Sequence, residues 1–186
     1  FRMVAVGNLR SIKNYIGMLN IVKQAKERGL EISLDIYGEG NQREILEEII
    51  VRNDLCNDVY LKGHVLNIYD ILPMYDCYLM TSFQEGFPNA LSEAMASGLP
   101  CVAYKCHDGF SELIRDGYDG YLITSGEEQK FVDRIENLYT DRELRRYIGQ
   151  NAIEISSRYS VDRVLAIWEQ CIQDAINIHN GLHTKN

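Results

Sequence analysis

The chain has 186 residues, 46% of them hydrophobic and 25% charged, which suits one domain with a complete core and is short for two. Its net charge of −8 argues against a nucleic-acid partner, because binding the phosphate backbone needs a clustered excess of Lys and Arg. No apolar run approaches the roughly 20 residues needed to cross a bilayer.

Strand-type apolar runs alternate with helical periodicity from the first residues to Ser125. The six predicted strands are Met3–Val6, Ile32–Tyr37, Val59–Leu61, Cys77–Met80, Cys101–Ala103 and Tyr121–Ile123. Strands separated by helices are typical of a parallel sheet covered on both faces. The predicted fold is therefore a doubly wound, Rossmann-like α/β domain with a six-stranded parallel sheet.

Two crossover helices are predicted from apolar residues at helical spacing. The first carries Ile12, Ile16, Leu19 and Val22. The second carries Ile45, Leu46, Ile49 and Ile50. A capping box of Asn41 and Glu44 is expected to introduce this second helix. A short helix is predicted at Ile68–Met74, and Asp-Gly pairs at 116–117 and 119–120 predict tight turns before the last strand.

After the last predicted strand the pattern is helical. The final helix is predicted to follow Ser160 as its N-cap, with Asp162 in the first turn. Its apolar stripe comprises Val164, Leu165, Trp168, Cys171, Ile172, Ala175 and Ile176. The single domain is accordingly divided into a sheet region (1–125), a helical C-terminal region (126–178) and a tail (179–186).

The five cysteines are odd in number and lack a C-x-x-C pair. This usage favours buried, reduced thiols over a disulfide framework or a zinc site. The predicted compartment is a reducing cytosol.

The stretch Thr81–Val102, TSFQEGFPNALSEAMASGLPCV, follows the fourth predicted strand. In an open parallel α/β sheet, ligands bind outside the carboxyl ends of the strands. Pro88 is predicted as the first residue of the next helix, which leaves the N–H groups of residues 89–91 free to meet a phosphate. Gly86 allows the backbone to approach a ligand closely.

Two glutamates, Glu85 and Glu93, lie on either side of this predicted helix start. Each carboxylate can accept hydrogen bonds from a vicinal diol, so the pair could grip a sugar and a ribose on either side of a diphosphate. Taken alone, the two glutamates are better explained as a solvated loop residue and a first-turn helix acid.

The run EGFPNALSEAMASGLP, Glu85–Pro100, resembles the motif of the retaining family 4 glycosyltransferases of the GT-B fold, in their C-terminal, donor-binding domain. Further segments match in the family's order: VGNLRSIKN, DIYGEG, VYLKGHV, SELIRDGYDGYLI and YSVDRVLAIW. The resemblance covers Met3 to about Ile178. It implies one half of a GT-B enzyme, and since Phe1 directly precedes a strand, the N-terminal acceptor domain is expected to lie outside this chain.

The resemblance implies roles for the residues that match the family motif. Glu85 would hold hydroxyls of the donor sugar, and Glu93 would hold the ribose. The sugar and the diphosphate would meet the backbone of Gly86, Phe87, Pro88, Asn89 and Leu91. Lys13 would neutralise the diphosphate, so Lys13 and Glu85 are the predicted catalytic residues.

One departure from the family concerns the diphosphate site. Asn8 stands where the family has an Arg directly after the first-strand glycine, and Arg10 is a candidate substitute. Loss of that cation predicts weaker stabilisation of charge on the leaving group. The family's nucleobase pocket is implied at the turns that contain Gly38, Gly40 and Val65.

The implied reaction transfers a sugar, with retention, from a nucleoside-diphosphate sugar to a hydroxyl of an acceptor glycan or glycolipid. Lys13 and the helix amides would stabilise the leaving diphosphate, while Glu85 orients the sugar. The family implies no cofactor and no metal ion. It also implies polysaccharide or glycolipid synthesis in the cytoplasm, with peripheral association of the full-length protein at the inner face of the membrane. This chain by itself is expected to bind the donor but scarcely to transfer the sugar.

Three alternatives stay open. A nucleotide-sugar epimerase or hydrolase of the same fold would need further acid or base residues. A non-catalytic nucleotide-sugar-binding module is a second alternative. A dinucleotide-binding or receiver domain fits less well, because neither G-x-G-x-x-G nor an acidic cluster follows the first strand.

Overall fold

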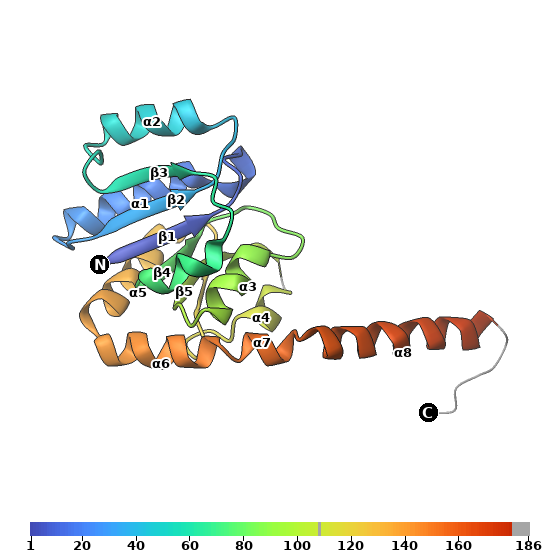
Figure 1. The fold of residues 1–186 in the computed structure, drawn as a ribbon. Coiled ribbons are helices and arrows are strands. Elements are labelled where there is room, and N and C mark those ends of the chain that lie inside the picture. Colours follow the sequence, from blue (N-terminus) through green and yellow to red (C-terminus); the bar gives the residue numbers. More distant parts are fainter. Residues whose placement is uncertain (108, 180–186) are drawn as a thin grey trace. The chain divides into compact units, whose positions relative to one another are not determined.

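The computed structural model describes residues 1–107 and 109–179 (Figure 1). The chain forms two compact units, Phe1–Ile153 and Glu154–Asn186. The first unit contains the whole sheet.

Six parallel strands form one sheet in the first unit (Figure 1). They are β1 (Arg2–Val6), β2 (Ser33–Tyr37), β3 (Val59–Gly63), β4 (Cys77–Met80), β5 (Cys101–Lys105) and β6 (Tyr121–Thr124). The spatial order is β3-β2-β1-β4-β5-β6, so the chain winds from the centre to one edge, returns, and winds to the other edge. All six predicted strands and the doubly wound class are confirmed, with small differences at the strand ends.

Helices cover both faces of this sheet, as predicted (Figure 1). They are η1 (Ser11–Lys13), α1 (Tyr15–Glu27), α2 (Arg43–Arg52), η2 (Ile68–Asp70), η3 (Leu72–Met74), α3 (Asn89–Ala96), α4 (Phe110–Leu113), α5 (Glu128–Thr140) and α6 (Arg142–Ala152). α1 packs against α2 and α5, while α3 packs against β4 and β5. α5 buries Phe131, Val132, Ile135 and Leu138 in the core of the sheet unit. α5 and α6 thus lie in the same compact unit as the sheet.

The first crossover helix begins later than predicted, at Tyr15. Asn14 adopts a left-handed backbone (φ 53°) between η1 and α1, a conformation that Asn tolerates better than most residues. Its side chain then caps α1 by accepting a hydrogen bond from the Gly17 N–H at 3.2 Å. As a result Ile12 and Ile16 are each 40% exposed and do not lie in the core stripe.

The predicted capping box of Asn41 and Glu44 is not formed. α2 begins after Gln42, and no side chain caps it. The Gln42 N–H donates to the Leu9 carbonyl at 3.0 Å, which keeps the preceding residues in a turn against the end of β1. Leu46 and Ile50 are buried as expected, whereas Ile45 is exposed.

The remaining local predictions are partly confirmed. The short helix at Ile68–Met74 forms as two 3₁₀ turns, η2 and η3. The turn before β6 forms with Gly117 at φ +76°. All five cysteines are free, and Cys77 and Cys101 are buried, but Cys56 and Cys171 are exposed.

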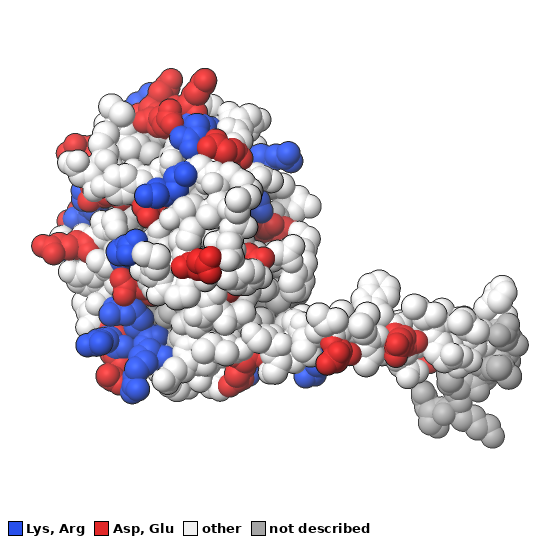
Figure 2. Space-filling model, in the orientation of Figure 1, with Lys and Arg blue, Asp and Glu red and all other residues white. Residues whose placement is uncertain are grey.

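Figure 2 shows basic side chains gathered on the first unit near α6, which carries Arg142, Arg145 and Arg146. Arg145 donates to the Leu138 carbonyl at 2.6 Å and lies 3.8 Å from Asp76. Arg146 pairs with Glu143 at 2.7 Å. Both side chains are thus engaged within the first unit.

The second unit contains α7 (Ile155–Arg158) and α8 (Val161–His179). Ser160 caps α8 as predicted, because its Oγ accepts a hydrogen bond from the Arg163 N–H at 3.4 Å. Apart from His179, the predicted tail 179–186 lies outside the described residues. None of the described helices is both long and apolar enough to cross a membrane.

Candidate functional site

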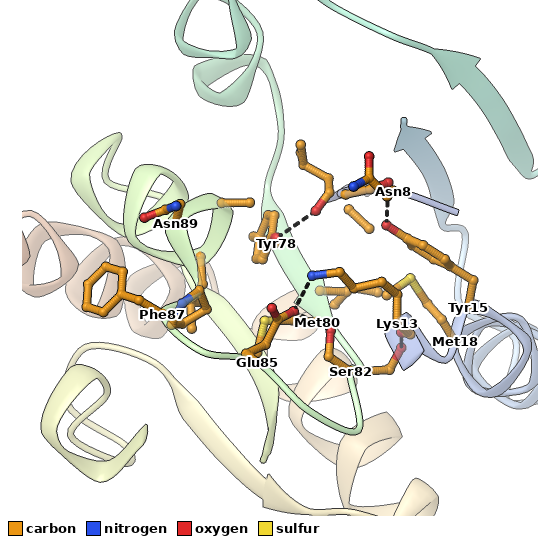
Figure 3. A pocket seen from close by; sticks show the side chains of 18 residues that line it. Asn8, Lys13, Tyr15, Met18, Tyr78, Met80, Ser82, Glu85, Phe87 and Asn89 are labelled. Carbon is orange, nitrogen blue, oxygen red and sulfur yellow. Dashed lines mark hydrogen bonds and ion pairs between the residues drawn. The ribbon is translucent and has the colours of Figure 1, made fainter. Parts of the chain in front are cut away.

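The candidate site lies beyond the carboxyl ends of β1 and β4, the two central strands. The strand order reverses at this point, and ligands of doubly wound sheets bind there. The segments that follow the two strands enclose a cavity of about 240 Å³ (Figure 3). Residues 7–15, the loop from Thr81 to Pro88 and the first turn of α3 contribute to its lining.

Lys13 and Glu85, the predicted catalytic residues, meet in this cavity. Figure 3 shows them pointing toward each other, and Lys13 Nζ lies 2.6 Å from Glu85 Oε1. Their side chains are only 24% and 12% exposed. Among the described residues that line the cavity, Lys13 is the only basic side chain and Glu85 the only acidic one. The site therefore contains one partly buried ion pair.

The start of α3 differs by one residue from the prediction. Pro88 has a ψ of 78°, which is not helical, so it occupies the N-cap position and Asn89 begins the helix. The Asn89 N–H donates to the Phe87 carbonyl at 3.0 Å and is not free. Ala90 and Leu91 line the cavity, and their N–H groups lie in the first turn, where a helix offers no acceptor of its own.

Three other residues predicted to contact the donor, Gly86, Phe87 and Glu93, lie outside the cavity lining or point away from Glu85 (Figure 3). Phe87 lines the cavity, but its ring points away from Glu85 in Figure 3 and is 50% exposed. Gly86 is exposed and Glu93 is partly buried one turn into α3, and neither belongs to the cavity lining. The carboxylate charge of Glu93 raises the pKa of the Tyr69 phenol, which places Tyr69 of η2 beside Glu93. No sequence pattern pointed to Tyr69.

A second cavity of about 230 Å³ adjoins the first, since Val6, Gly7 and Asn8 line both. Gly38 and Val65, two of the residues predicted for the nucleobase, line this second cavity.

Gly40, the third residue predicted for the nucleobase, does not line the second cavity. A Cβ atom at Gly40 would lie 2.4 Å from the Leu9 carbonyl oxygen. The need for glycine at position 40 is therefore explained by close packing against the backbone of Leu9.

Arg10 lies apart from both cavities. It lines a separate cavity of about 290 Å³, together with Ile16 and Phe83. Asn8, in contrast, stands at the junction of the first two cavities. The structure therefore places no arginine beside Lys13 among the described residues of the first cavity lining.

Several residues that brace the site were not predicted. The Tyr15 hydroxyl donates to the Gly7 carbonyl at 3.1 Å, and the Tyr78 hydroxyl to the Val6 carbonyl at 3.4 Å, so both hold the end of β1. Thr81 and Ser82 are buried directly after β4. Thr81 and Ser82 could have been noticed in the sequence, because two hydroxyl side chains stand there between an apolar strand and Glu85.

Among the described residues, no group of three or more His, Cys, Asp or Glu side chains is arranged to hold a metal ion. The independence of metal ions stays a prediction.

The model of the family "Glycosyl transferases group 1" matches residues 1–155. The GtfA subunit of the UDP-N-acetylglucosamine–peptide N-acetylglucosaminyltransferase of Streptococcus pneumoniae is 28% identical over an alignment of 184 residues that covers 95% of this chain and 36% of that protein. The chain thus spans about a third of the length of that relative.

Two solved structures share the fold. S. aureus TarM, crystallised with Fondaparinux, alpha-GlcNAc-glycerol and UDP, superposes with a TM-score of 0.87 and 25% identity, over 91% of this chain and 34% of TarM. The C-terminal domain of the group 1 family protein LpcC from Francisella tularensis superposes with a TM-score of 0.74 and 23% identity, over 86% of this chain and 85% of that domain. The sheet is thus that of a GT-B glycosyltransferase domain, and the family match over residues 1–155 shows that the chain belongs to the group 1 glycosyl transferases.

Proposed function

We propose that this chain binds the donor of a retaining glycosyltransferase of family 4, and that the donor is a UDP-sugar. The observation that carries the proposal is the Lys13–Glu85 ion pair, held in a cavity beside the first turn of α3. That combination offers a cation and backbone N–H groups to a diphosphate, and a carboxylate to sugar hydroxyls.

The two adjoining cavities suggest how the donor lies. The diphosphate and sugar occupy the first cavity, where the Lys13 ammonium and the N–H groups of Ala90 and Leu91 meet the phosphates. The nucleobase occupies the second cavity, against Gly38 and Val65. Glu93 accepts hydrogen bonds from the ribose hydroxyls. When the bond to the leaving diphosphate breaks, Lys13 stabilises the growing charge on its oxygens.

Support for UDP and for retention comes from the relatives. The S. pneumoniae relative is named for UDP-N-acetylglucosamine, and TarM was crystallised with UDP and alpha-GlcNAc-glycerol. The common UDP-sugars carry an α-linked sugar, so an α-linked product corresponds to retention. We extend both properties to this chain on the strength of its family membership.

The acceptor and the setting are part of the same proposal. We infer that the acceptor is a hydroxyl of a glycan or glycolipid, and that an N-terminal domain of the same enzyme binds it. The full-length protein works in the cytoplasm, at the inner face of the membrane, and needs no metal ion. Glu85 orients the sugar and forms no covalent bond to it.

A screen of nucleotide sugars tests the proposal. The 186-residue chain is mixed with UDP, GDP and ADP forms of glucose and N-acetylglucosamine, and its melting temperature is measured with and without EDTA. We expect stabilisation by UDP-sugars that exceeds stabilisation by the GDP and ADP forms and is unchanged by EDTA. A chain that responds to none of these compounds contradicts the proposal, and loss of the response in EDTA contradicts metal independence.

The two glutamates provide a second test, because they are assigned to different parts of the donor. Glu93→Ala is expected to weaken both UDP and UDP-N-acetylglucosamine by about tenfold, since both ligands contain the ribose. Glu85→Ala is expected to weaken UDP-N-acetylglucosamine by about tenfold but to leave UDP unchanged or tighter, because Lys13 loses its competing partner. Titration calorimetry measures both ligands, with Glu48→Ala on the exposed face of α2 as the control. Equal losses in the two variants would remove this division of roles.

A further inference from the structure

Two of the three buried polar or charged residues among the described residues line the candidate site. They are Thr81 and Ser82, which are 0% and 2% exposed, and the third is Asp119. Asp119 is explained by its turn, where it accepts hydrogen bonds from the Arg115 N–H and Nε at 2.7 Å. Buried hydroxyls are costly unless they are hydrogen-bonded, so the partners of Thr81 and Ser82 indicate their function.

Ser82 is bonded to the carboxylate of the site itself. Its Oγ donates to Glu85 Oε1 at 2.7 Å, and the same oxygen accepts the Lys13 ammonium at 2.6 Å. Within residues 1–107 and 109–179, Glu85 Oε2 has no hydrogen-bond partner. One carboxylate oxygen is therefore held from two sides while the other is available.

The backbone that carries Ser82 is fixed as well. The Thr81 hydroxyl donates to the Asn14 carbonyl at 2.9 Å, and the Phe83 N–H donates to the Ile12 carbonyl at 2.9 Å. The Cys106 thiol donates to the Ser82 carbonyl at 3.0 Å. Burial, and then the charge of Glu85, raises the pKa of that thiol to about 11, so it stays protonated as a donor. These bonds hold the backbone on both sides of Ser82, so its side chain starts from a fixed position.

We propose that Ser82 is a positioning residue for donor-sugar recognition: its hydroxyl holds Glu85 Oε1 so that Oε2 is presented to the hydroxyls of the sugar. The inference rests on the proposed function, because it assumes that Glu85 receives the sugar. In this role Ser82 acts on the sugar through Glu85. When a diphosphate draws Lys13 away, the Ser82 bond is what keeps the Glu85 carboxylate in the same orientation.

The test compares two ligands in the 186-residue chain by titration calorimetry. Ser82→Ala is expected to weaken UDP-N-acetylglucosamine or UDP-glucose by about tenfold while changing UDP by less than about twofold. Ser82→Thr keeps the hydroxyl and is expected to restore the sugar preference. Ser82→Cys keeps the size with a weak donor and is expected to behave like Ser82→Ala. It also serves as the measured variant if the alanine variant does not fold.

A double-mutant cycle separates positioning from general damage. In a Glu85→Ala background, Ser82→Ala is expected to cause no further loss, because the carboxylate that it positions is gone. Ser157→Ala is the matched control, since it removes a hydroxyl that donates to the Glu154 carbonyl at 2.9 Å in the second unit. Equal weakening of UDP and UDP-sugar by Ser82→Ala, or an additive loss in the Glu85→Ala background, overturns the inference. If the unmodified chain binds no UDP-sugar, the proposed function fails instead; if it binds and Ser82→Ala binds equally well, only this inference fails.

Discussion

Replacing Lys13 with alanine is expected to lower the affinity for UDP by about 30-fold and to leave the affinity for uridine within about twofold. Hydrogen bonds to charged groups contribute about 2 kcal/mol, which corresponds to this factor. Lys13 is the only basic residue among the described residues that line the first cavity, and Asn8 provides no second cation. No other described residue of this lining can therefore replace the lost positive charge. Titration calorimetry with UDP and uridine measures the effect.

The ion pair between Lys13 and Glu85 leads to a second expected result, for a double variant. Lys13→Ala leaves Glu85, which is 12% exposed, without its cation and close to the bound diphosphate. The double variant Lys13→Ala, Glu85→Ala should therefore bind UDP more tightly than Lys13→Ala alone, because the repulsive carboxylate is gone. Lys130→Ala is the control, since Lys130 is also ion-paired, with Glu127 at 2.5 Å, but does not line the cavity. Unchanged UDP affinity in Lys13→Ala would reject the role of this residue at the diphosphate.

The strands could be predicted from the sequence because a buried parallel strand is a short apolar run between turn residues. β4 is buried at all four positions, and its residues were identified without error. The starts of α1 and α2 could not be predicted in this way. They depend on the left-handed backbone of Asn14 and on the bond from Gln42 to Leu9, which joins segments far apart in the sequence.

The candidate site was likewise predictable only in part. Lys13 and Glu85 could be identified from motifs, since each follows a central strand and matches a family pattern. The ion pair between them could not be predicted. The two residues are 72 positions apart in the sequence, and this spacing does not determine the distance between Lys13 Nζ and Glu85 Oε1. The sequence assigned the two residues to different parts of a ligand, whereas in the structure they first bind each other. Ser82 was missed because a motif records which residues recur and not which hydroxyl holds a carboxylate.

Glycines at 38 and 40 were predicted as ligand contacts; only Gly38 lines the second cavity, and the structure gives close backbone packing as a reason for both glycines. Both lie in the turn after β2, where the chain passes close to the residues that follow β1. Gly38 has φ +145°, and a larger side chain at this position would meet the backbone of Gly7. Sequence alone could not separate a glycine that lets a ligand approach from one that lets another backbone approach.

Gly38→Ala is expected to lower the melting temperature by about 10 °C, corresponding to about 4 kcal/mol in a chain of this size. A Cβ atom at Gly38 would lie 2.0 Å from the Gly7 carbonyl oxygen and 2.8 Å from its carbon. Neither segment can move freely, because the Gly7 N–H donates to the Tyr37 carbonyl at 2.9 Å and the Gly38 N–H to the Gly63 carbonyl at 2.8 Å. Overpacking costs about 1–3 kcal/mol and the unusual φ about 1–3 kcal/mol. Thermal unfolding followed by circular dichroism measures the shift.

Gly29→Ala separates the steric clash from the backbone strain. Gly29 also has a positive φ, +85°, but apart from its own chain neighbours no atom lies within 4 Å of the position that a Cβ atom would take. Its substitution should cost only the backbone strain, about 1 kcal/mol, and lower the melting temperature by about 3 °C. Because Gly38 lines the second cavity and Gly29 does not, only Gly38→Ala should also weaken UDP at a temperature where both variants are folded. Equal shifts in the two variants would show that the contact of the added Cβ atom with Gly7 costs nothing beyond the backbone strain.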